Sequence, residues 1–552
     1  MKVTVLGATG LFGARICRLL ARDPAIEITA VARDRAKLER LRRELGVAIA
    51  AFDLAGDWRA ALAATTPDLV IHTAGPFQGH SYAVADACIA MGAHYVDLAD
   101  ARGFVAGVGA LDDKARAANV LVASGASSVP ALSAAVVDRL RDGFAGIEAI
   151  DIAITPGNRA PRGRATVAAI LSYVGHTLRW WRAGRWEEVV GWHDLHRRRL
   201  PTLGRRWFSA CDVPDLELFP GRYQVRERVL FDAGLELPLL HLGLWLLSWP
   251  VRWGWPRSLA PAAGLIAWLA DRVRALGTDR GGMAVDVAGR LADGRAVTRR
   301  WRLIAEAGDG PWVPALAAVA LARGLARGAI AARGARPCVG LLTLGDILAV
   351  ADGLAIRTSA DEIGPVYETV CGTDAITGLP APIRALHDNV SRACWSGRAD
   401  ITGASNPLAF IAARIIGMPR AAREVDVTVA FEVRDGVERW RRSFARRPFV
   451  SLQYAGEGLD TGTVIERFGA LSFALRNTLD DKGLSQEIAA AYVLGIRLPR
   501  PLWPRIRARE RLDGQGRFTF DVAIAVPLLG RLVAYKGWLI PDDTRAHAEE
   551  AA

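Results

Sequence analysis

Several residue patterns that would direct the chain to an oxidising compartment or to metal chemistry are missing from the sequence. Its six cysteines are far apart, with no CxxC pair, and no histidine spacing is typical of a zinc site. We therefore expect buried thiols in a reducing compartment and no bound metal. The chain also runs from Met1 straight into a strand, without the charged leader and apolar stretch of a signal peptide, which predicts a cytoplasmic protein.

Long apolar runs without charge are missing too. The most apolar segment, 235–269, is rich in leucine and tryptophan, but prolines and arginines divide it into pieces shorter than the roughly 20 residues that a spanning helix needs. Two interpretations stay open. One is a buried helical hairpin; the other is an interfacial patch or the wall of a lipid-sized pocket, which would place the protein peripherally at the inner face of a membrane. The dividing residues are Pro238, Pro250, Arg252, Pro256, Arg257 and Pro261.

Negative charge is in the minority, and the formal net charge is +12 over 552 residues. The excess arginines are scattered among acids and form no basic cluster with a geometry for reading nucleic acid, so we expect no nucleic-acid partner. A chain of this length with 51% hydrophobic residues exceeds what one core usually holds, which predicts two or three domains.

Three textures follow one another along the chain. Residues 1–130 alternate short β-branched runs with amphipathic stretches, which is typical of a doubly wound parallel sheet. Residues 131–355 are less regular and predict a central α+β domain for substrate binding or dimerisation, with a homodimer left open. Residues 365–541 alternate apolar and polar residues between turns, which predicts a mostly antiparallel sheet. The expected fold class is α/β in an N-terminal Rossmann domain, followed by a central α+β domain and a C-terminal mostly antiparallel β domain.

A glycine-rich turn connects the first predicted strand to the first helix. Glycine allows a tight turn and a close approach of pyrophosphate, while the helix N-terminus offers free N–H groups to the phosphates. Because the turn follows a clear strand inside a βαβ unit, it indicates a dinucleotide site rather than only a tight connection. The turn consists of Gly7, Ala8, Thr9, Gly10, Leu11, Phe12 and Gly13.

The end of the second predicted strand indicates which dinucleotide binds. An acidic residue there would bond the ribose 2′-hydroxyl of NAD, whereas Arg33 suits the 2′-phosphate of NADP. Asp34 is placed to cap the following helix. Asp53, after the third strand, is expected either near the adenine or as the cap of a helix near Trp58. We predict NADP as the cofactor, with NAD left open.

Candidates for the rest of the site follow the fourth and fifth strands, at the carboxyl edge where open α/β sheets bind ligands. Hydride transfer needs a proton donor beside the nicotinamide, and a histidine or a tyrosine can act as one. For each of them a structural role is the alternative. The cofactor-binding candidates are Thr73, Ala74, Gly75 and Pro76, and the catalytic candidates are His80, Tyr95 and Asp97.

Taken together, these stretches resemble the saccharopine dehydrogenase-like oxidoreductases over the first quarter of the chain. The resemblance implies an NAD(P)-binding domain followed by an α+β domain that closes over the nicotinamide. The sequence has Ala99-Asp100-Ala101 where the family often has Thr-Gly-Glu, so no glutamate role is carried over, and the catalytic pattern of saccharopine-forming enzymes has no clear match. The matching stretches are 7–13, Ala32-Arg33, 75–77, Ala87-Cys88, 92–98 and 124–130.

The C-terminal third resembles a bacterial domain of unknown function that is found behind such Rossmann domains. The resemblance supplies no activity. A curved antiparallel sheet with Trp, Phe and Leu on one face can either hold a hydrophobic ligand or pack against helices, and both interpretations stay open. The matching stretches are Leu379-Pro380, Leu386-His387, 438–444, Leu498-Pro499, Pro504 and 534–537.

The sequence thus predicts an NADP-dependent oxidoreductase, a reductase that acts on an apolar or lipid-like small molecule. Two alternatives remain. One keeps the enzyme class, as an enoyl reductase that works in trans on fatty-acyl or polyketide chains. The other is a non-enzymatic lipid-binding or membrane-surface protein that retains a cofactor domain.

Overall fold

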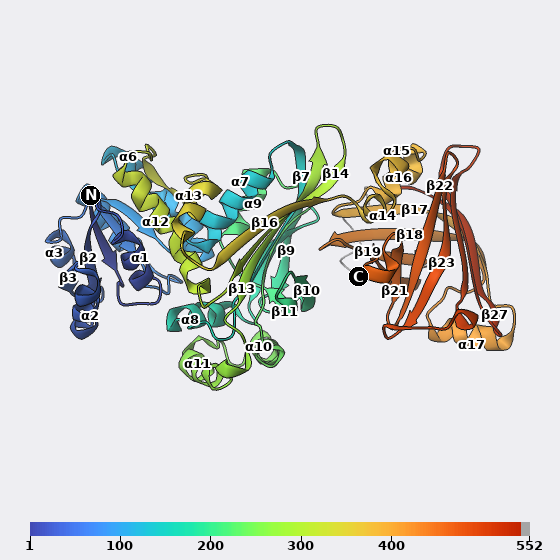
Figure 1. Cartoon of the computed structure of the whole chain (residues 1–552), viewed down its shortest axis with the longest axis horizontal. Helices are drawn as coiled ribbons and strands as arrows, with labels where there is room; N and C mark the ends of the chain where they lie inside the picture. The colour runs from blue at the N-terminus through green and yellow to red at the C-terminus, as the bar shows by residue number, and fades with distance from the viewer. Residues whose placement is uncertain (446, 543–552) are drawn as a thin grey trace. The chain divides into compact units, whose positions relative to one another are not determined.

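The computed structural model describes residues 1–445 and 447–542, shown in Figure 1 in colours that run from the N-terminus to the C-terminus. The chain folds as two compact units, each built from separate segments. Unit 1 comprises Met1–Asp142, Ile150–Val287 and Arg300–Ala360. Unit 2 comprises Gly143–Ala149, Ala288–Arg299 and Asp361–Ala552.

Unit 1 begins with a parallel sheet of order β15-β6-β5-β4-β1-β2-β3. The strands are short apolar runs because helices cover both faces, and β4 is buried at all four of its positions. The doubly wound sheet predicted from the sequence is confirmed, and β15 adds a seventh strand from far along the chain. The strands are β1 (Lys2–Leu6), β2 (Glu27–Ala32), β3 (Ala48–Ala51), β4 (Leu69–His72), β5 (His94–Asp97), β6 (Leu121–Ser124) and β15 (Gly334–Pro337). The helices are α1 (Gly13–Leu20), α2 (Arg35–Leu45), α3 (Arg59–Ala63), α4 (Ala83–Ala90), α5 (Arg102–Gly107), α6 (Asp112–Ala117) and α7 (Ser133–Leu140).

A second, mixed sheet has the order β10-β11-β12-β7-β13-β14-β16, with β8 paired to β12 and β9 paired to β8. Together with its helices it confirms the expected central α+β region. The strands are β7 (Phe144–Thr155), β8 (Thr177–Arg182), β9 (Arg185–Val190), β10 (His196–Leu200), β11 (Gly204–Ala210), β12 (Arg228–Ala233), β13 (Gly281–Leu291), β14 (Ala296–Ala305) and β16 (Ile356–Ile363). The helices are α8 (Arg164–Tyr173), α9 (Asp215–Tyr223), α10 (Pro238–Arg252), α11 (Ala263–Arg272), α12 (Val313–Ala326) and α13 (Leu344–Leu348).

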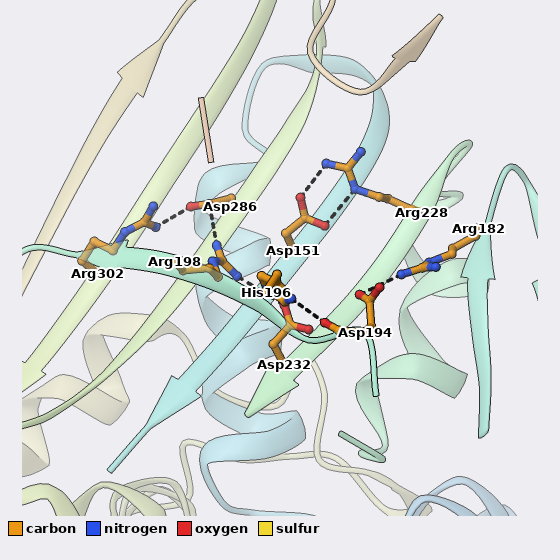
Figure 2. A network of polar contacts seen from close by, with 9 residues as sticks. All are labelled: Asp151, Arg182, Asp194, His196, Arg198, Arg228, Asp232, Asp286 and Arg302. Carbon is orange, nitrogen blue, oxygen red and sulfur yellow. Dashed lines mark hydrogen bonds and ion pairs between the residues drawn. The ribbon is translucent and has the colours of Figure 1, made fainter. Parts of the chain in front are cut away.

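Paired charges lie inside this mixed sheet, as Figure 2 shows. The guanidinium of Arg198 is fully buried and lies 3.6 Å from Asp232 and 3.1 Å from Asp286. Arg228 donates two hydrogen bonds to Asp151, of 2.9 and 2.6 Å. Buried charges are tolerated only when they are paired and hydrogen-bonded. These pairs therefore connect β7, β10, β12 and β13 at a place where unpaired side chains of this type would destabilise the fold.

The apolar segment 235–269 does not form the buried hairpin that was one of its two interpretations. Pro238 is the first residue of α10 and Pro250 lies in its last turn, so the prolines do not divide the helix. Leu244, Val251 and Leu259 pack in a small core, but half of the large apolar side chains of α10, α11 and the loop between them are exposed: Trp255 is 82% exposed, Trp253 75% and Leu239 71%. None of the helices within the described residues is long and apolar enough to cross a membrane.

The C-terminal strands form an antiparallel sheet of order β22-β21-β20-β19-β18-β17-β27-β26-β25-β23-β24. The sheet closes on itself because β22 also pairs with β23, so that ten strands form a barrel and β24 lies outside the closed path. The predicted antiparallel domain is thus confirmed. The strands are β17 (Arg392–Thr402), β18 (Ala422–Arg434), β19 (Val437–Phe444), β20 (Arg447–Ala455), β21 (Val464–Phe468), β22 (Leu471–Asp480), β23 (Gly483–Val493), β24 (Ile496–Arg497), β25 (Arg505–Leu512), β26 (Phe518–Val526) and β27 (Gly530–Pro541). The helices are α14 (Val366–Cys371), α15 (Thr373–Thr377), α16 (Ala381–His387) and α17 (Pro407–Ile415).

Candidate active site

The glycine turn has the close packing that a phosphate-binding loop requires. Gly7 has a φ of +81°, and a Cβ there would lie 2.7 Å from the Thr73 hydroxyl oxygen. A Cβ on Gly13 would overlap the Gly7 carbonyl oxygen, whereas a Cβ on Gly10 would meet only that oxygen, at 3.1 Å. Gly7 and Gly13 are therefore required by the turn itself. The turn does not itself require Gly10, so Gly10 stays the glycine predicted to make room for a ligand.

The fourth strand supplies the opposite side of this turn. Thr73 donates a hydrogen bond of 2.8 Å to the carbonyl of Leu6, so its hydroxyl ties the end of β4 to the end of β1. A Cβ on Gly7 would also lie 3.1 Å from the backbone nitrogen of Ala74. The candidates from Thr73 to Pro76 thus begin beside the turn, at the position where the strand order reverses. The small residues at this edge leave room for a dinucleotide.

Arg33 follows the end of β2 with its side chain 78% exposed, and a guanidinium nitrogen lies 3.7 Å from Asp53. Asp34 accepts a hydrogen bond of 3.0 Å from the Lys37 backbone N–H and is the N-cap of α2, as predicted. Asp53 accepts from the Ala55 backbone N–H and lies outside α3, which begins at Arg59. Arg33 thus presents a guanidinium to solvent at the end of β2, which fits a 2′-phosphate, while the Asp34 carboxylate is engaged as the helix cap.

Two of the three catalytic candidates lie inside the protein. Tyr95 is 1% exposed, and its hydroxyl is 3.0 Å from Nδ1 of His72. Asp97 is fully buried and accepts hydrogen bonds from the Ser124 hydroxyl and from the backbone N–H groups of Ala99 and Gly125. Burial raises the pKa of Asp97 to about 6, against the opposing effect of these bonds. Both side chains hold β5 to its neighbours, which is a structural role.

His80, the third candidate, is exposed in the loop after β4. Its ring lies edge-on to Phe77 at 5.9 Å between centroids. It therefore has the access that Tyr95 and Asp97 lack, and it stays a candidate.

A polar cluster that the sequence did not predict lies where the central region meets this edge. The Tyr173 hydroxyl, at the end of α8, is 2.9 Å from Sγ of Cys211. Burial raises the pKa of Tyr173 well above its ordinary value, with smaller contributions from Cys211, Asp212 and Asp100. Burial also raises the pKa of the Asp100 and Asp212 carboxyls, and the charge of Asp212 raises the pKa of Asp100 further. The arrangement places a protonated phenol in one cluster with two carboxyl groups whose pKa values burial raises.

Arg102 fixes one side of this cluster. It lies 3.4 Å from Asp212 and 2.7 Å from Glu217, and it donates a hydrogen bond of 2.7 Å to the carbonyl of Arg179. Asp100 accepts a hydrogen bond of 3.3 Å from the Gln78 amide. Arg102, Asp100 and Gln78 belong to the Rossmann region, whereas Asp212 and Glu217 belong to the central region. The cluster therefore joins the two parts of unit 1.

Helix α8 connects this cluster with the glycine turn. A Cβ on Gly163, the residue before α8, would lie 3.6 Å from the Leu11 side chain. The ten residues of α8 span about 15 Å and end at Tyr173. Helix α8 therefore begins beside the glycine turn and ends at the cluster. No sequence motif marks Cys211, Asp212 or Tyr173. They are recognised as a cluster only because the fold brings them close together.

One group of potential metal ligands occurs in the described part of the chain. Ligand atoms of Asp194, His196 and Asp232 lie within 4.8 Å of one another. Arg182 pairs with Asp194 at 3.0 Å, and Arg198 pairs with Asp232 at 3.6 Å. These guanidinium groups already supply the positive charge that an ion would bring, so we assign no metal to this group.

Comparison with known proteins supports the two resemblances found in the sequence. Residues 3–123 match the saccharopine dehydrogenase NADP binding domain, and residues 379–539 match a domain of unknown function, DUF4166. No curated protein matches the chain significantly.

Solved structures are similar only at low identity. A saccharopine dehydrogenase (L-Glu forming) from Saccharomyces cerevisiae is 14% identical, with a TM-score of 0.47, over 65% of this chain and 99% of that chain. A homospermidine synthase from Legionella pneumophila, solved with NAD, is 11% identical, with a TM-score of 0.44, over 66% of this chain and 91% of that chain. At these scores the likeness supports no activity. The family matches establish that the chain has a saccharopine dehydrogenase NADP-binding domain at its N-terminus and a DUF4166 domain at its C-terminus.

Proposed function

We propose that the chain is an NADP(H)-dependent reductase that acts on an apolar or lipid-like substrate, with Tyr173 as the proton donor. The observation that carries the proposal is the cluster of Tyr173, Asp100 and Asp212 within the same compact unit as the glycine turn. Arg33 at the end of β2 supports NADP rather than NAD, because a guanidinium pairs well with a phosphate.

The chemistry divides between cofactor and chain. NADPH, when bound, supplies the hydride. Tyr173 stays protonated at neutral pH because burial raises its pKa, so it can give a proton to the atom that would otherwise carry the new negative charge. The phenolate then takes back a proton from solvent, and Asp100 and Asp212, whose carboxyl pKa values burial raises, lie in the same cluster to relay it. The substrate gains one hydride and one proton in total.

The test measures NADPH oxidation by the full chain with long-chain aldehydes, ketones and enoyl thioesters. Tyr173→Phe keeps the ring and removes the proton donor, so we expect kcat to fall by about 10²- to 10⁴-fold while NADPH binding is unchanged. Reduction of enoyl thioesters alone would favour the trans-acting enoyl reductase. If no substrate is reduced while NADPH still binds, the chain is the non-enzymatic alternative. Unchanged kcat in Tyr173→Phe would remove the tyrosine from the mechanism and return attention to His80.

We also propose that the surface of α10 and α11 contacts an anionic membrane. Its exposed side chains include Trp253, Trp255, Leu265 and Trp268. Residues 237–276 contain four arginines and one aspartate, a composition that suits anionic headgroups. The guanidinium of Arg272 lies 4.2 Å from the ring centre of Trp268, so a positive charge and an aromatic ring lie side by side on this surface. A surface of this kind would bring the reductase to a lipid substrate.

A further inference from the structure

The two ends of the barrel of unit 2 differ: α14 to α16 cover one end, and the single helix α17 packs at the other. The connections at 435–436, 456–463, 481–482 and 513–517 lie at the first end, where α14 to α16 lead into β17. Side chains of these helices, including Tyr367, Ile383 and Leu386, pack into one core with the inner side chains of the strands. The segments 403–421, 469–470, 494–504 and 527–529 lie at the other end, which we call the mouth. Figure 1 shows α17 at this end and α14 to α16 at the opposite one.

The barrel encloses a cavity of about 300 Å³, a size at the lower end of the pockets that bind small molecules. Most of its wall is aromatic or aliphatic. Helix α17 and the mouth segments also contribute, through Ala412, Ile416, Leu498 and Leu529, so the cavity extends to the mouth. Because ten strands are closed around it, a ligand can reach this cavity most directly past α17.

Most polar side chains of the wall already have hydrogen-bond partners within the fold. Arg442 lies 3.0 Å from Glu466, and the Ser451 hydroxyl joins both, at 2.7 and 2.8 Å. Tyr367 donates to the Gln453 amide oxygen at 3.0 Å, and Gln453 donates to Glu466 at 3.1 Å. Arg442 and Glu466, each with only 13–14% of its side chain exposed, cancel in charge, and the second glutamate of the wall, Glu510, is hydrogen-bonded to His387 at 2.6 Å. A ligand with a formal charge would therefore stay uncompensated here, whereas a neutral ligand would not.

Tyr535 is the polar exception in this wall. Its ring packs between Phe444 and Phe520, and its hydroxyl makes no hydrogen bond within residues 1–445 and 447–542. Burial raises the pKa of Tyr535 to about 12, and the neighbouring Arg442 and Glu466 act in opposite directions. The hydroxyl is thus protonated and available to one hydroxyl or carbonyl oxygen of a ligand.

The mouth is apolar and basic. Its exposed side chains are Leu408, Phe410, Ile411, Ile415, Leu494, Ile496, Leu502 and Leu528. The four mouth segments contain Arg414, Arg420, Arg497 and Arg500 and no aspartate or glutamate. Apolar side chains that protrude among arginines are typical of proteins that bind an anionic bilayer surface. Because the mouth segments also line the apolar cavity, a lipid that enters past them can keep its apolar chain in contact with apolar side chains.

We propose that the barrel of unit 2 binds a neutral lipid with a single hydroxyl or carbonyl group, taken up through the mouth from an anionic bilayer. This lipid site is distinct from the nucleotide site of unit 1. It would make neutral lipids the ligands of the DUF4166 domain. It goes beyond the proposed reductase activity and does not depend on it.

The first experiment titrates the full chain with pyrenyl-decanol and with pyrenyl-decanoic acid, without NADPH, and follows pyrene fluorescence. We expect saturable binding of the alcohol and binding of the acid weaker by tenfold or more. Tyr535→Phe should weaken the alcohol about three- to tenfold, the value of one hydrogen bond. Ala508→Trp, which fills the cavity, should abolish binding. Equal affinity for alcohol and acid, or unchanged binding in Ala508→Trp, would overturn the proposal.

The second experiment measures transfer of pyrenyl-decanol from vesicles that contain 30% phosphatidylglycerol. Ile415→Glu at the mouth should slow transfer at least fivefold without changing affinity for alcohol added from ethanol. Leu459→Glu is the matched control, because Leu459 is also largely exposed (91%, against 81% for Ile415) but lies at the covered end. Equal slowing by both variants would exclude the mouth as the entrance. The Gly10→Asp variant should bind the alcohol normally, so a failure of the cofactor site and a failure of the barrel site can be told apart.

Discussion

Arg33 and Asp53 face each other from the ends of neighbouring strands, with a guanidinium nitrogen 3.7 Å from a carboxylate oxygen. Exposed ion pairs of this kind contribute about 0–1 kcal/mol, so the guanidinium can exchange Asp53 for a phosphate. We expect the wild type to prefer NADPH over NADH by roughly tenfold to a hundredfold, because charge-assisted bonds to a phosphate are worth about 1.5–3 kcal/mol each before screening. Arg33→Ala should remove this preference, as measured by calorimetric titration with both cofactors.

Two further variants sharpen this test. Asp53→Asn removes the competing carboxylate and should strengthen NADPH binding about two- to fivefold while NADH changes little. Arg40→Ala removes an exposed charge from α2 beyond its first turn and should leave the ratio of dissociation constants unchanged. If the wild type binds NADH as tightly as NADPH, Arg33 does not read the 2′-phosphate.

The glycine turn allows the binding role of Gly10 to be separated from folding. A Cβ there meets only the Gly7 carbonyl oxygen, at 3.1 Å, so the turn can accept a side chain with a small adjustment. Gly10→Asp should keep the thermal transition within a few degrees but abolish nucleotide binding, since its carboxylate would meet the pyrophosphate. Gly10→Ala should bind with intermediate affinity. Retained NADPH affinity in Gly10→Asp would show that the turn is only structural.

The sequence predicts those parts of the molecule that depend on neighbours along the chain. The glycine turn and the Asp34 cap are local, and both lie where the pattern indicates. The cluster around Tyr173 is different, because Asp100, Tyr173 and Asp212 come from three distant segments with no shared motif. Closure of the barrel is equally non-local. It requires both the hairpin pairing of β22 with β23 and the pairing of β17 with β27. The residues of β27 lie more than a hundred positions after β17, and alternating polarity does not encode that partner.

The exposed tryptophans of unit 1 provide a test at the membrane. Trp253 and Trp255 are 75% and 82% exposed, so replacing them removes little packing within the fold. Trp253→Ser combined with Trp255→Ser should lower binding to vesicles with 30% phosphatidylglycerol about tenfold or more and leave the thermal transition unchanged. Co-sedimentation measures this.

The companion control concerns charge. Neutral phosphatidylcholine vesicles should bind the wild type more weakly than anionic ones, because the arginines then lack a partner. Protein that stays in the supernatant with both vesicle types would assign this surface to another partner. Protein released only by detergent would show that the attachment is more than peripheral.

Glu438 makes the stability of the barrel depend on pH. Its carboxyl is fully buried, and Oε2 accepts a hydrogen bond of 2.8 Å from the Trp440 indole. Burial raises the pKa of Glu438 from 4.5 to about 7. The folded state thus holds this proton more tightly than the unfolded state, so the stability is fully present below pH 4.5 and falls as the pH rises toward 7. At 1.36 kcal/mol per pH unit the loss amounts to about 3 kcal/mol.

Glu438→Gln removes that loss, because glutamine keeps an oxygen for the indole and never ionises. The variant should unfold at a higher temperature than the wild type at pH 8 and at nearly the same temperature at pH 5, as measured by scanning calorimetry of the full chain. Glu487→Gln is the control: Glu487 is exposed on β23, so its replacement should leave both transitions in place. A Glu438→Gln variant that shifts the transition equally at pH 5 and pH 8 would mean that the wild-type carboxyl does not change its ionisation between them, and that the barrel carries a buried negative charge throughout.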